Sequence, residues 1–211
     1  MNKKELKNTM VITSLVLLIP MIVGVILWSQ LPETIATHFE LNNQANGWSS
    51  KTFTVFGIPL VMLAIQWVCF LATFFDPKKK NISLKLIKNI LWLVPLISLS
   101  VMLSIYSKAL GFSLNVGPVS HLLVGFVFIV IGNYLHKVKR NYTIGIKIPW
   151  TLNSKENWNK TNRLSDWLFV MGGLVFLINS YFLNYWIMAI VIGIIVFVPV
   201  GYSFLLFKKG I

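Results

Sequence analysis

The sequence predicts an all-α integral membrane protein with six transmembrane helices and both termini in the cytoplasm. Hydrophobic residues make up 56% of the chain and charged residues 12%, and the mean hydropathy is +0.73. An aqueous domain of this length could not bury so much apolar surface, so most of it must face lipid. Apolar runs long enough to cross a bilayer recur along the chain and leave no room for a sizeable soluble domain.

The distribution of charge predicts the orientation of these helices. If the loops alternate between the two faces, all but two of the nineteen Lys and Arg residues, Lys51 and Lys108, fall on one face. An excess of cations marks the cytoplasmic side, so an even number of spans places both termini inside. The net charge of +13 then points to anionic lipids at the inner surface as partners, and not to nucleic acid.

The first span is expected from Val11 to about Leu31, as an uncleaved signal anchor, because this apolar stretch is too long for a signal peptide. The only sizeable outer loop, residues 31–51, follows it. Residues 35–41 alternate between two sides as a strand does, and Asn46-Gly47 is a turn signal. The loop is therefore expected to contain a short β segment and a turn on the outer surface.

The other five spans follow from apolar runs separated by polar or charged residues. They are expected at about 53–75, 89–110, 118–136, 167–183 and 186–207. The link between the third and fourth spans is short, so these helices should be antiparallel neighbours. We divide the chain into an N-terminal part with two helices and the outer loop, residues 1–88, and a C-terminal part with four helices, residues 89–211.

The longest polar interruption, residues 141–163, lies on the predicted cytoplasmic face between the fourth and fifth spans. Pro149 keeps the residue before it extended. A helix start is expected at Asn153, which can cap the helix, with Glu156 three residues later as in a capping box. This basic helix, with Trp158 at the headgroup level, would either anchor the fifth span or dock a cytosolic protein.

Several kinds of chemistry lack the residues they need. The cores of the predicted spans hold no Asp, Glu, Lys or Arg, which ion-coupled transporters and intramembrane proteases generally require. Phosphate-binding, zinc-protease and nucleophile-elbow motifs are absent. His38 and Glu40 would project to one side of the strand, but two ligands do not make a metal site, so structural or partner contact is favoured. We expect a binding protein without catalysis, metal or cofactor.

Two stretches of the sequence resemble one family. Asn141, residues 144–147 and 149–152, Trp158, Thr161 and Arg163 resemble the signature loop of the SdpI family, membrane proteins that give immunity to a secreted sporulation-delay toxin. Leu31-Pro32, Ile35, His38-Phe39, Gly47 and Lys51 resemble the small membrane-associated domain of unknown function (DUF1648-like) often found at the N-terminal end of that family. Lys147 and Asn162 depart from the pattern, which usually has Arg and His there.

The resemblance implies a protein of the bacterial cell membrane that protects against a secreted toxin and also signals by holding a cytosolic autorepressor at the membrane. The alternatives are a small transporter or permease subunit, and a lipid-headgroup enzyme using Glu156 and Asp166 with lysines of the loop. The toxin is expected to contact the outer loop at Pro32, Glu33, His38, Phe39, Glu40, Gly47 and Lys51. Signalling is expected to involve Asn141, Gly145, Lys147, Pro149, Trp150, Thr151, Trp158, Thr161, Asn162 and Arg163.

Overall fold

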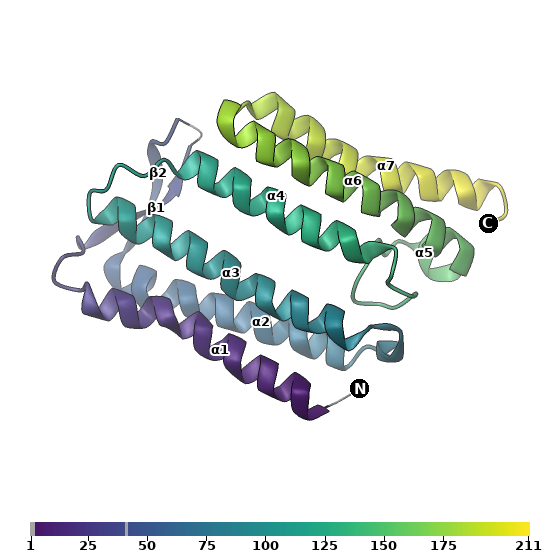
Figure 1. Cartoon of the computed structure of the whole chain (residues 1–211), viewed down its shortest axis with the longest axis horizontal. Helices are drawn as coiled ribbons and strands as arrows, with labels where there is room; N and C mark the ends of the chain where they lie inside the picture. Colours follow the sequence, from purple (N-terminus) through teal and green to yellow (C-terminus); the bar gives the residue numbers. More distant parts are fainter. Residues whose placement is uncertain (1–2, 41) are drawn as a thin grey trace. The chain divides into compact units, whose positions relative to one another are not determined.

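The structure is a computed structural model that describes residues 3–40 and 42–211. It is mostly helical, with one small sheet (Figure 1). In chain order the elements are α1 (Lys3–Ile26), β1 (Thr34–Phe39), β2 (Ala45–Ser50), the π-helical turn η1 (Phe53–Gly57), α2 (Ile58–Phe74), the 3₁₀ turn η2 (Lys79–Asn81), α3 (Leu84–Ala109), α4 (Val116–Leu135), α5 (Pro149–Asn153), α6 (Lys155–Phe182) and α7 (Tyr185–Lys208).

Six helices among the described residues are long and apolar enough to cross a membrane, which confirms the predicted number. The second of them joins η1 to α2 and runs from Phe53 to Phe74; the others coincide with α1, α3, α4, α6 and α7. The chain is therefore a multi-pass membrane protein. The cytoplasmic placement of both termini and the division at residue 88 stay predictions.

The start of α6 differs from the expected one. The helix runs unbroken from Lys155 to Phe182, so the expected surface helix is the first part of the fifth span. Ser154 caps it, because its side chain accepts a hydrogen bond from the Asn157 backbone N–H at 3.2 Å. The predicted cap, Asn153, is instead the last residue of the short helix α5. α5 begins at Pro149, because proline is favoured at the first position of a helix, and it ends at Asn153. The cap of α6 therefore lies one position later, at Ser154.

The outer loop forms an antiparallel β-hairpin, here called the hairpin (residues 34–50). β1 lies close to the predicted β segment, although Leu41 falls outside the described residues. The prediction of a turn at Asn46-Gly47 was wrong, because both residues lie in β2 and the chain reverses at residues 40–44. Gly47 pairs with His38, and a Cβ added to it would lie 3.0 Å from the His38 Cβ. The glycine thus allows close strand pairing.

The described chain forms two compact units. The first comprises residues up to Phe70 together with Lys88–Leu123. Inside it, the Tyr106 hydroxyl donates to the Pro20 carbonyl at 2.9 Å, and Gln66 Nε2 donates to Thr13 Oγ1 at 2.6 Å. Gly24 gives Tyr106 its room, since an added Cβ would lie 2.4 Å from the hydroxyl. Both hydrogen bonds join helices inside the apolar part of the unit, where such bonds stabilise packing.

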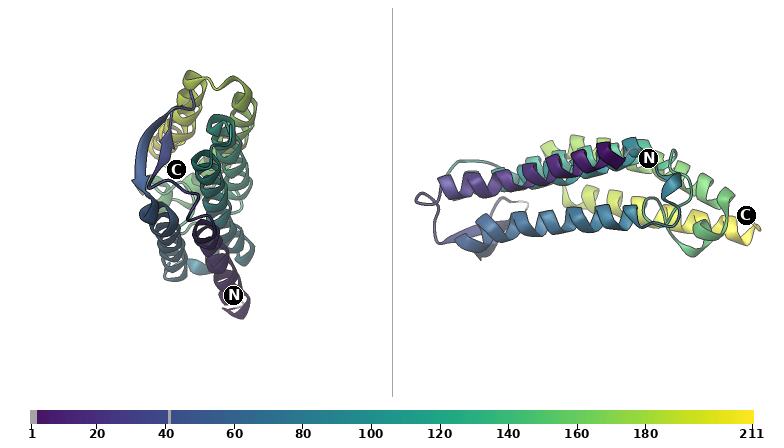
Figure 2. Two further views of the ribbon diagram at one scale, coloured as in Figure 1. Left: turned by 90° about the vertical axis from the view of Figure 1, so that its left-hand side faces the viewer. Right: turned by 90° about the horizontal axis from the view of Figure 1, so that it is seen from below.

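The second unit comprises Leu71–Ile87 and Val124–Ile211. Within it α6 and α7 lie side by side and antiparallel, joined by a short turn (Figures 1 and 2). Phe176, Val191 and Ile195 form their shared core. α4 approaches α6 closely, because a Cβ added to Gly125 would lie 2.8 Å from the Gly173 carbonyl oxygen. Small residues at a contact allow this backbone approach between membrane helices.

Candidate functional site

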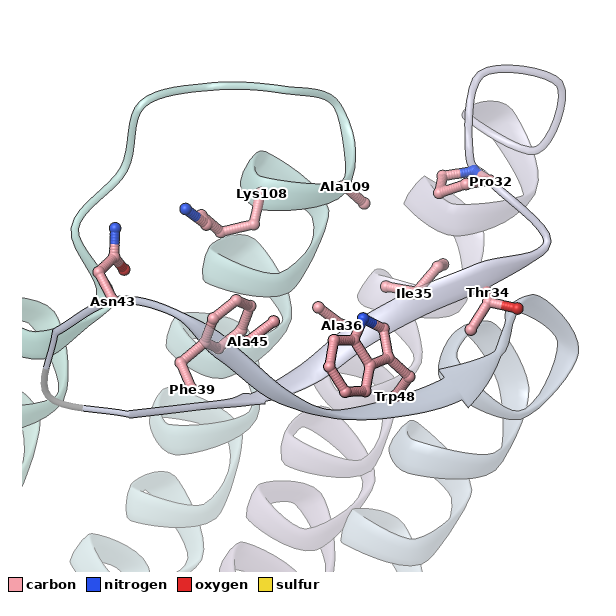
Figure 3. Close-up of a pocket in the computed structure, with 10 residues that line it drawn as sticks. All are labelled: Pro32, Thr34, Ile35, Ala36, Phe39, Asn43, Ala45, Trp48, Lys108 and Ala109. Carbon is pink, nitrogen blue, oxygen red and sulfur yellow. The ribbon is translucent and has the colours of Figure 1, made fainter.

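The hairpin and the end of α3 enclose an open pocket of about 280 Å³ (Figure 3). Its walls are mainly apolar, and Lys108 is the one charged residue in them. The lining residues are Pro32, Thr34, Ile35, Ala36, Phe39, Asn43, Ala45, Trp48, Lys108 and Ala109. An apolar pocket with few polar groups is the usual form of a ligand site.

The hairpin is held firmly to the rest of the first unit. Ile35 is 1% exposed and belongs to a buried cluster with Ile105 and Tyr106 of α3. At the hairpin tip, Asn43 donates to the Leu114 carbonyl at 3.2 Å and accepts from the Val116 N–H at 3.0 Å. A two-stranded hairpin alone is marginally stable, so these anchors fix its position.

Two side chains in the pocket wall are suited to contact a ligand. Trp48 is 59% exposed although it lies in a paired strand. Lys108 Nζ lies 5.8 Å from the centroid of the Phe39 ring, and no carboxylate partner is found for it among the described residues. An exposed aromatic ring and a cation in the lining of one pocket are common features of binding hot spots.

The predicted contact residues of the outer loop occupy different positions. Pro32 and Phe39 line the pocket, and Glu33, His38 and Glu40 are exposed. His38 Nδ1 contacts Asn46 Oδ1, and the Asn46 amide donates to Glu40 at 3.2 Å. Residues 3–40 and 42–211 contain no group of three or more His, Cys, Asp or Glu that could hold a metal ion. His38 and Glu40 are thus joined through an amide side chain.

Lys51 has a structural position. Its side chain is 7% exposed, and its ammonium group lies 2.7 Å from a Glu33 carboxylate oxygen. The same group donates to the Trp28 carbonyl at 3.3 Å and lies over the Trp28 ring. Because the ammonium group is already paired within the first unit, Lys51 fixes the end of the hairpin and is not available to bind a ligand.

The 141–163 segment, in the second unit, is organised around Asn141, whose side chain is fully buried. Its amide oxygen accepts from the backbone N–H groups of Thr143 at 2.8 Å and Ile144 at 2.7 Å. Its amide nitrogen donates to the carbonyls of Lys139 and Ile144, both at 2.9 Å. One side chain therefore satisfies four backbone groups in a stretch without regular secondary structure.

Asp76 provides a second anchor that sequence reasoning missed, since the residue was taken only to mark the end of a span. It is 4% exposed. One carboxylate oxygen accepts from the Tyr142 N–H at 2.8 Å and from the Thr143 hydroxyl at 2.6 Å, and the other accepts from the Lys78 N–H at 2.6 Å. Hydrogen bonds to a carboxylate are stronger than neutral ones, so Asp76 fixes the start of the segment.

The middle of the segment packs against the start of α6. Trp158 donates its indole N–H to the Val138 carbonyl at 2.7 Å, and Asn162 accepts from the Ile146 N–H at 3.0 Å. Gly145 has φ +120°, and a Cβ there would lie 2.8 Å from the Asn162 amide oxygen. Trp158 is fully buried, because its ring fills the space beneath this glycine, and its expected place at the headgroup level stays a prediction.

The predicted signalling residues thus fall into three groups by exposure. The buried group supports the segment from inside; it comprises Asn141, Thr151, Trp158, Thr161 and Asn162. The exposed group comprises Lys147, Pro149 and Arg163. Gly145 and Trp150 are half-buried, and the Trp150 ring lies 5.0 Å from the Phe204 ring of α7. Only the exposed group is available to a partner without a structural change.

Comparisons with known proteins identify the same two regions. Residues 137–203 match the SdpI/YfhL protein family, and residues 15–63 match a domain of unknown function (DUF1648). Immunity protein SdpI of Bacillus subtilis (strain 168) is 29% identical over 186 residues, which cover 88% of this chain and 87% of that protein. No solved structure matches the chain. The resemblance to the SdpI family is therefore confirmed, with the SdpI/YfhL segment at residues 137–203 and the DUF1648 segment at residues 15–63.

Proposed function

We propose that this chain is an immunity protein of the bacterial cell membrane, which protects the cell from a secreted, membrane-active toxin by binding it, without catalysis. The observation that carries the proposal is the similarity to Immunity protein SdpI, which extends over 88% of this chain and 87% of that protein. Such coverage includes the hairpin and the 141–163 segment together with most of the membrane helices. The proposed orientation follows the cation asymmetry, with the hairpin outside and the 141–163 segment and both termini inside.

The hairpin pocket is the proposed site of toxin contact. A peptide with an apolar side chain could insert it against Phe39 and Trp48, and an acidic group of the same peptide could pair with Lys108. The preformed site would limit the ordering cost of binding. Pro32 would belong to the pocket wall and Glu33, His38 and Glu40 to a polar rim, whereas Lys51 supports the hairpin from inside.

The second part of the proposal is signalling through a cytosolic repressor held at the membrane. The exposed group of the 141–163 segment, Lys147, Pro149 and Arg163, offers a basic surface for such a partner. Toxin can change the affinity for the repressor only if it binds one arrangement of the protein better than another. Asn162 stands where the family usually has His; its amide accepts from the Ile146 N–H and donates to the Trp158 carbonyl, and a neutral imidazole likewise has one donor and one acceptor.

The transporter alternative is less well supported. Among the described residues, the buried Lys, Arg, Asp and Glu side chains are Lys51 and Asp76, and both lie outside the six spans. A coupled transporter generally needs such a group at membrane depth. The enzyme alternative relied on Glu156 and Asp166, but Glu156 pairs with Lys160 on the exposed side of α6 and Asp166 pairs with His136. These pairs give two separate contacts and no shared site.

A survival assay tests the proposal. A toxin-sensitive bacterial host expresses the wild-type chain, a Phe39→Ala variant or a Trp150→Ala variant at matched membrane levels, and is challenged with toxin. We expect the wild type to protect and Phe39→Ala to protect less, because it removes part of the pocket wall. Trp150→Ala should retain protection if toxin contact is confined to the hairpin. Death of well-expressing wild-type cells would refute immunity to that toxin.

Signalling needs a separate readout. A fluorescent repressor fusion is followed in cells with and without toxin, for the wild type and a Lys147→Gln variant. We expect the fusion to move to the membrane with toxin in the wild type, and to do so less in the variant. A fusion that stays cytosolic while the cells survive would remove signalling from the proposal and leave immunity in place.

A further inference from the structure

A second open cleft lies in the second unit, between the end of α4 and the first half of α6. Its volume is about 440 Å³, and it is lined by His136, Asn159, Arg163, Asp166 and Trp167. All five side chains can donate or accept a hydrogen bond, and three can carry charge. The lining differs in kind from the apolar pocket beside the hairpin, so a different class of ligand is expected.

The position of this cleft along its helices places it at the surface of the membrane. Asp166 is the last charged residue of α6, and no Asp, Glu, Lys or Arg occurs from Trp167 to Phe182. α4 likewise contains none of these residues, and His136 follows its last residue directly. Both helices therefore change from lipid-compatible to polar at the level of the cleft. Trp167 is 65% exposed, as expected for an aromatic ring at the headgroup level.

The charges in the cleft favour an anion. His136 Nδ1 contacts an Asp166 carboxylate oxygen, so the Asp166 carboxylate already has a partner in the cleft wall. The Asp166 side chain is 14% exposed, so the carboxylate is largely covered. Arg163 is exposed, and no hydrogen bond or ion pair is found for its guanidinium group within the described part of the chain. The available charge is therefore the guanidinium, the preferred group for binding a phosphate through two parallel hydrogen bonds.

We propose that this cleft binds the phosphate group of one anionic phospholipid. Arg163 binds the phosphate oxygens, and the Asn159 amide donates a further hydrogen bond. Asp166 holds the His136 ring in the wall, and the Trp167 ring lies against the glycerol part of the lipid. A free phosphate ion has the same recognition chemistry, but the position at the polar end of two membrane spans favours the lipid. The inference does not rest on the proposed immunity function, although Arg163 also belongs to the exposed group proposed to meet a repressor.

Native mass spectrometry of the full chain in detergent micelles tests this site. The wild type, Arg163→Gln and Lys155→Gln are mixed with phosphatidylglycerol or phosphatidylcholine, and the retained lipid is counted per chain. Lys155→Gln is the matched control, because Lys155 is exposed on the same helix and outside the cleft lining. We expect the wild type and Lys155→Gln to retain one phosphatidylglycerol, and Arg163→Gln to bind it about tenfold more weakly.

Three outcomes would overturn the proposal. Equal weakening in the two variants would mean a diffuse basic surface and no site. Equal retention of phosphatidylcholine would mean that the anionic charge is not recognised. Displacement of phosphatidylglycerol by millimolar inorganic phosphate would assign the cleft to a free ion. Thermal unfolding of each variant verifies that Arg163→Gln is folded; if it is not, an Asn159→Ala variant, with weaker binding expected, replaces it.

Discussion

In the hairpin the backbone of two strands supplies most of the hydrogen bonds, whereas in the irregular first part of the 141–163 segment, before α5, buried side chains supply many of them. The hairpin rests on one deeply buried apolar residue, Ile35, and leaves Trp48 59% exposed. The first part of the 141–163 segment, residues 141–148, has no regular secondary structure and depends on Asn141, Asp76 and Asn162, each at most 4% exposed.

The two regions show that a residue typical of a family can serve either to stabilise the backbone or to line a pocket. In the 141–163 segment the unusual residues are distinctive because an irregular backbone needs them to satisfy its N–H and C=O groups. In the hairpin the ladder satisfies the backbone, so side chains such as Phe39 and Trp48 are free to form a pocket wall. Substitutions should therefore reduce stability in the first region and ligand binding in the second.

The largest loss of stability is expected for Asn141→Ala, in the 141–163 segment. The substitution leaves two N–H groups and two carbonyls, all in part-buried hydrogen bonds, without their partner, so the free energy of unfolding should fall by about 4 kcal/mol. Unfolding of the purified chain in detergent micelles measures the change. Asn153→Ala is the control, since Asn153 is exposed and should change stability by about 0.5 kcal/mol or less. Equal stability of the two variants would show that the segment does not depend on Asn141.

A Gly145→Ala variant tests whether close packing also stabilises the 141–163 segment. The new methyl group would meet Asn162 and Trp158 at under 3 Å, in a backbone conformation with φ +120°. We expect a loss of about 2 to 3 kcal/mol, measured in the same way. Gly111→Ala is the matched control, because Gly111 has φ +83° and nothing within 4 Å of the added Cβ. Gly111→Ala should lose only the cost of placing a side chain on a left-handed backbone, about 1 kcal/mol. A similar loss of stability in both variants would exclude a packing role for Gly145.

Much of the fold could be predicted from the sequence. The six spans are apolar runs of membrane length, and this signal is local and strong. The second strand was missed because Ala-Asn-Gly-Trp-Ser-Ser has low strand propensity and contains a turn dipeptide; pairing with β1 overrides both. The unbroken α6 was also missed, because polar residues continue the helix without a break in periodicity.

The sites were less predictable, since they depend on residues far apart in the chain. Asp76 meets Tyr142 and Thr143, and Lys108 meets Phe39, through contacts that no local pattern encodes. The resemblance identified the right stretches, but it could not show which of their residues are buried. Asn141 and Lys147 look equally suited to partner binding in sequence, yet only Lys147 is exposed.

Asp76→Asn tests whether the second anchor acts with the first. An amide keeps one acceptor oxygen but replaces the other with a donor, so a loss of about 1 to 2 kcal/mol is expected. The double variant with Asn141→Ala should lose less than the sum, because both side chains hold Thr143. Unfolding of the four proteins gives the coupling energy, and strict additivity would mean that the two anchors act independently.

The smallest effect on stability is expected for Trp48→Ala. This variant directly tests the difference between the hairpin and the 141–163 segment. The ring is 59% exposed, so the free energy of unfolding should change by about 0.5 kcal/mol or less, while toxin affinity should fall about thirtyfold if the ring is a hot spot. Trp186→Ala is the control, since that ring is 71% exposed on α7 and lies outside the pocket. Toxin titration of purified protein gives the affinities. If Trp48→Ala instead lost stability on the scale of Asn141→Ala, the hairpin would depend on its side chains as the 141–163 segment does, and an exposed aromatic ring would no longer indicate a binding surface there.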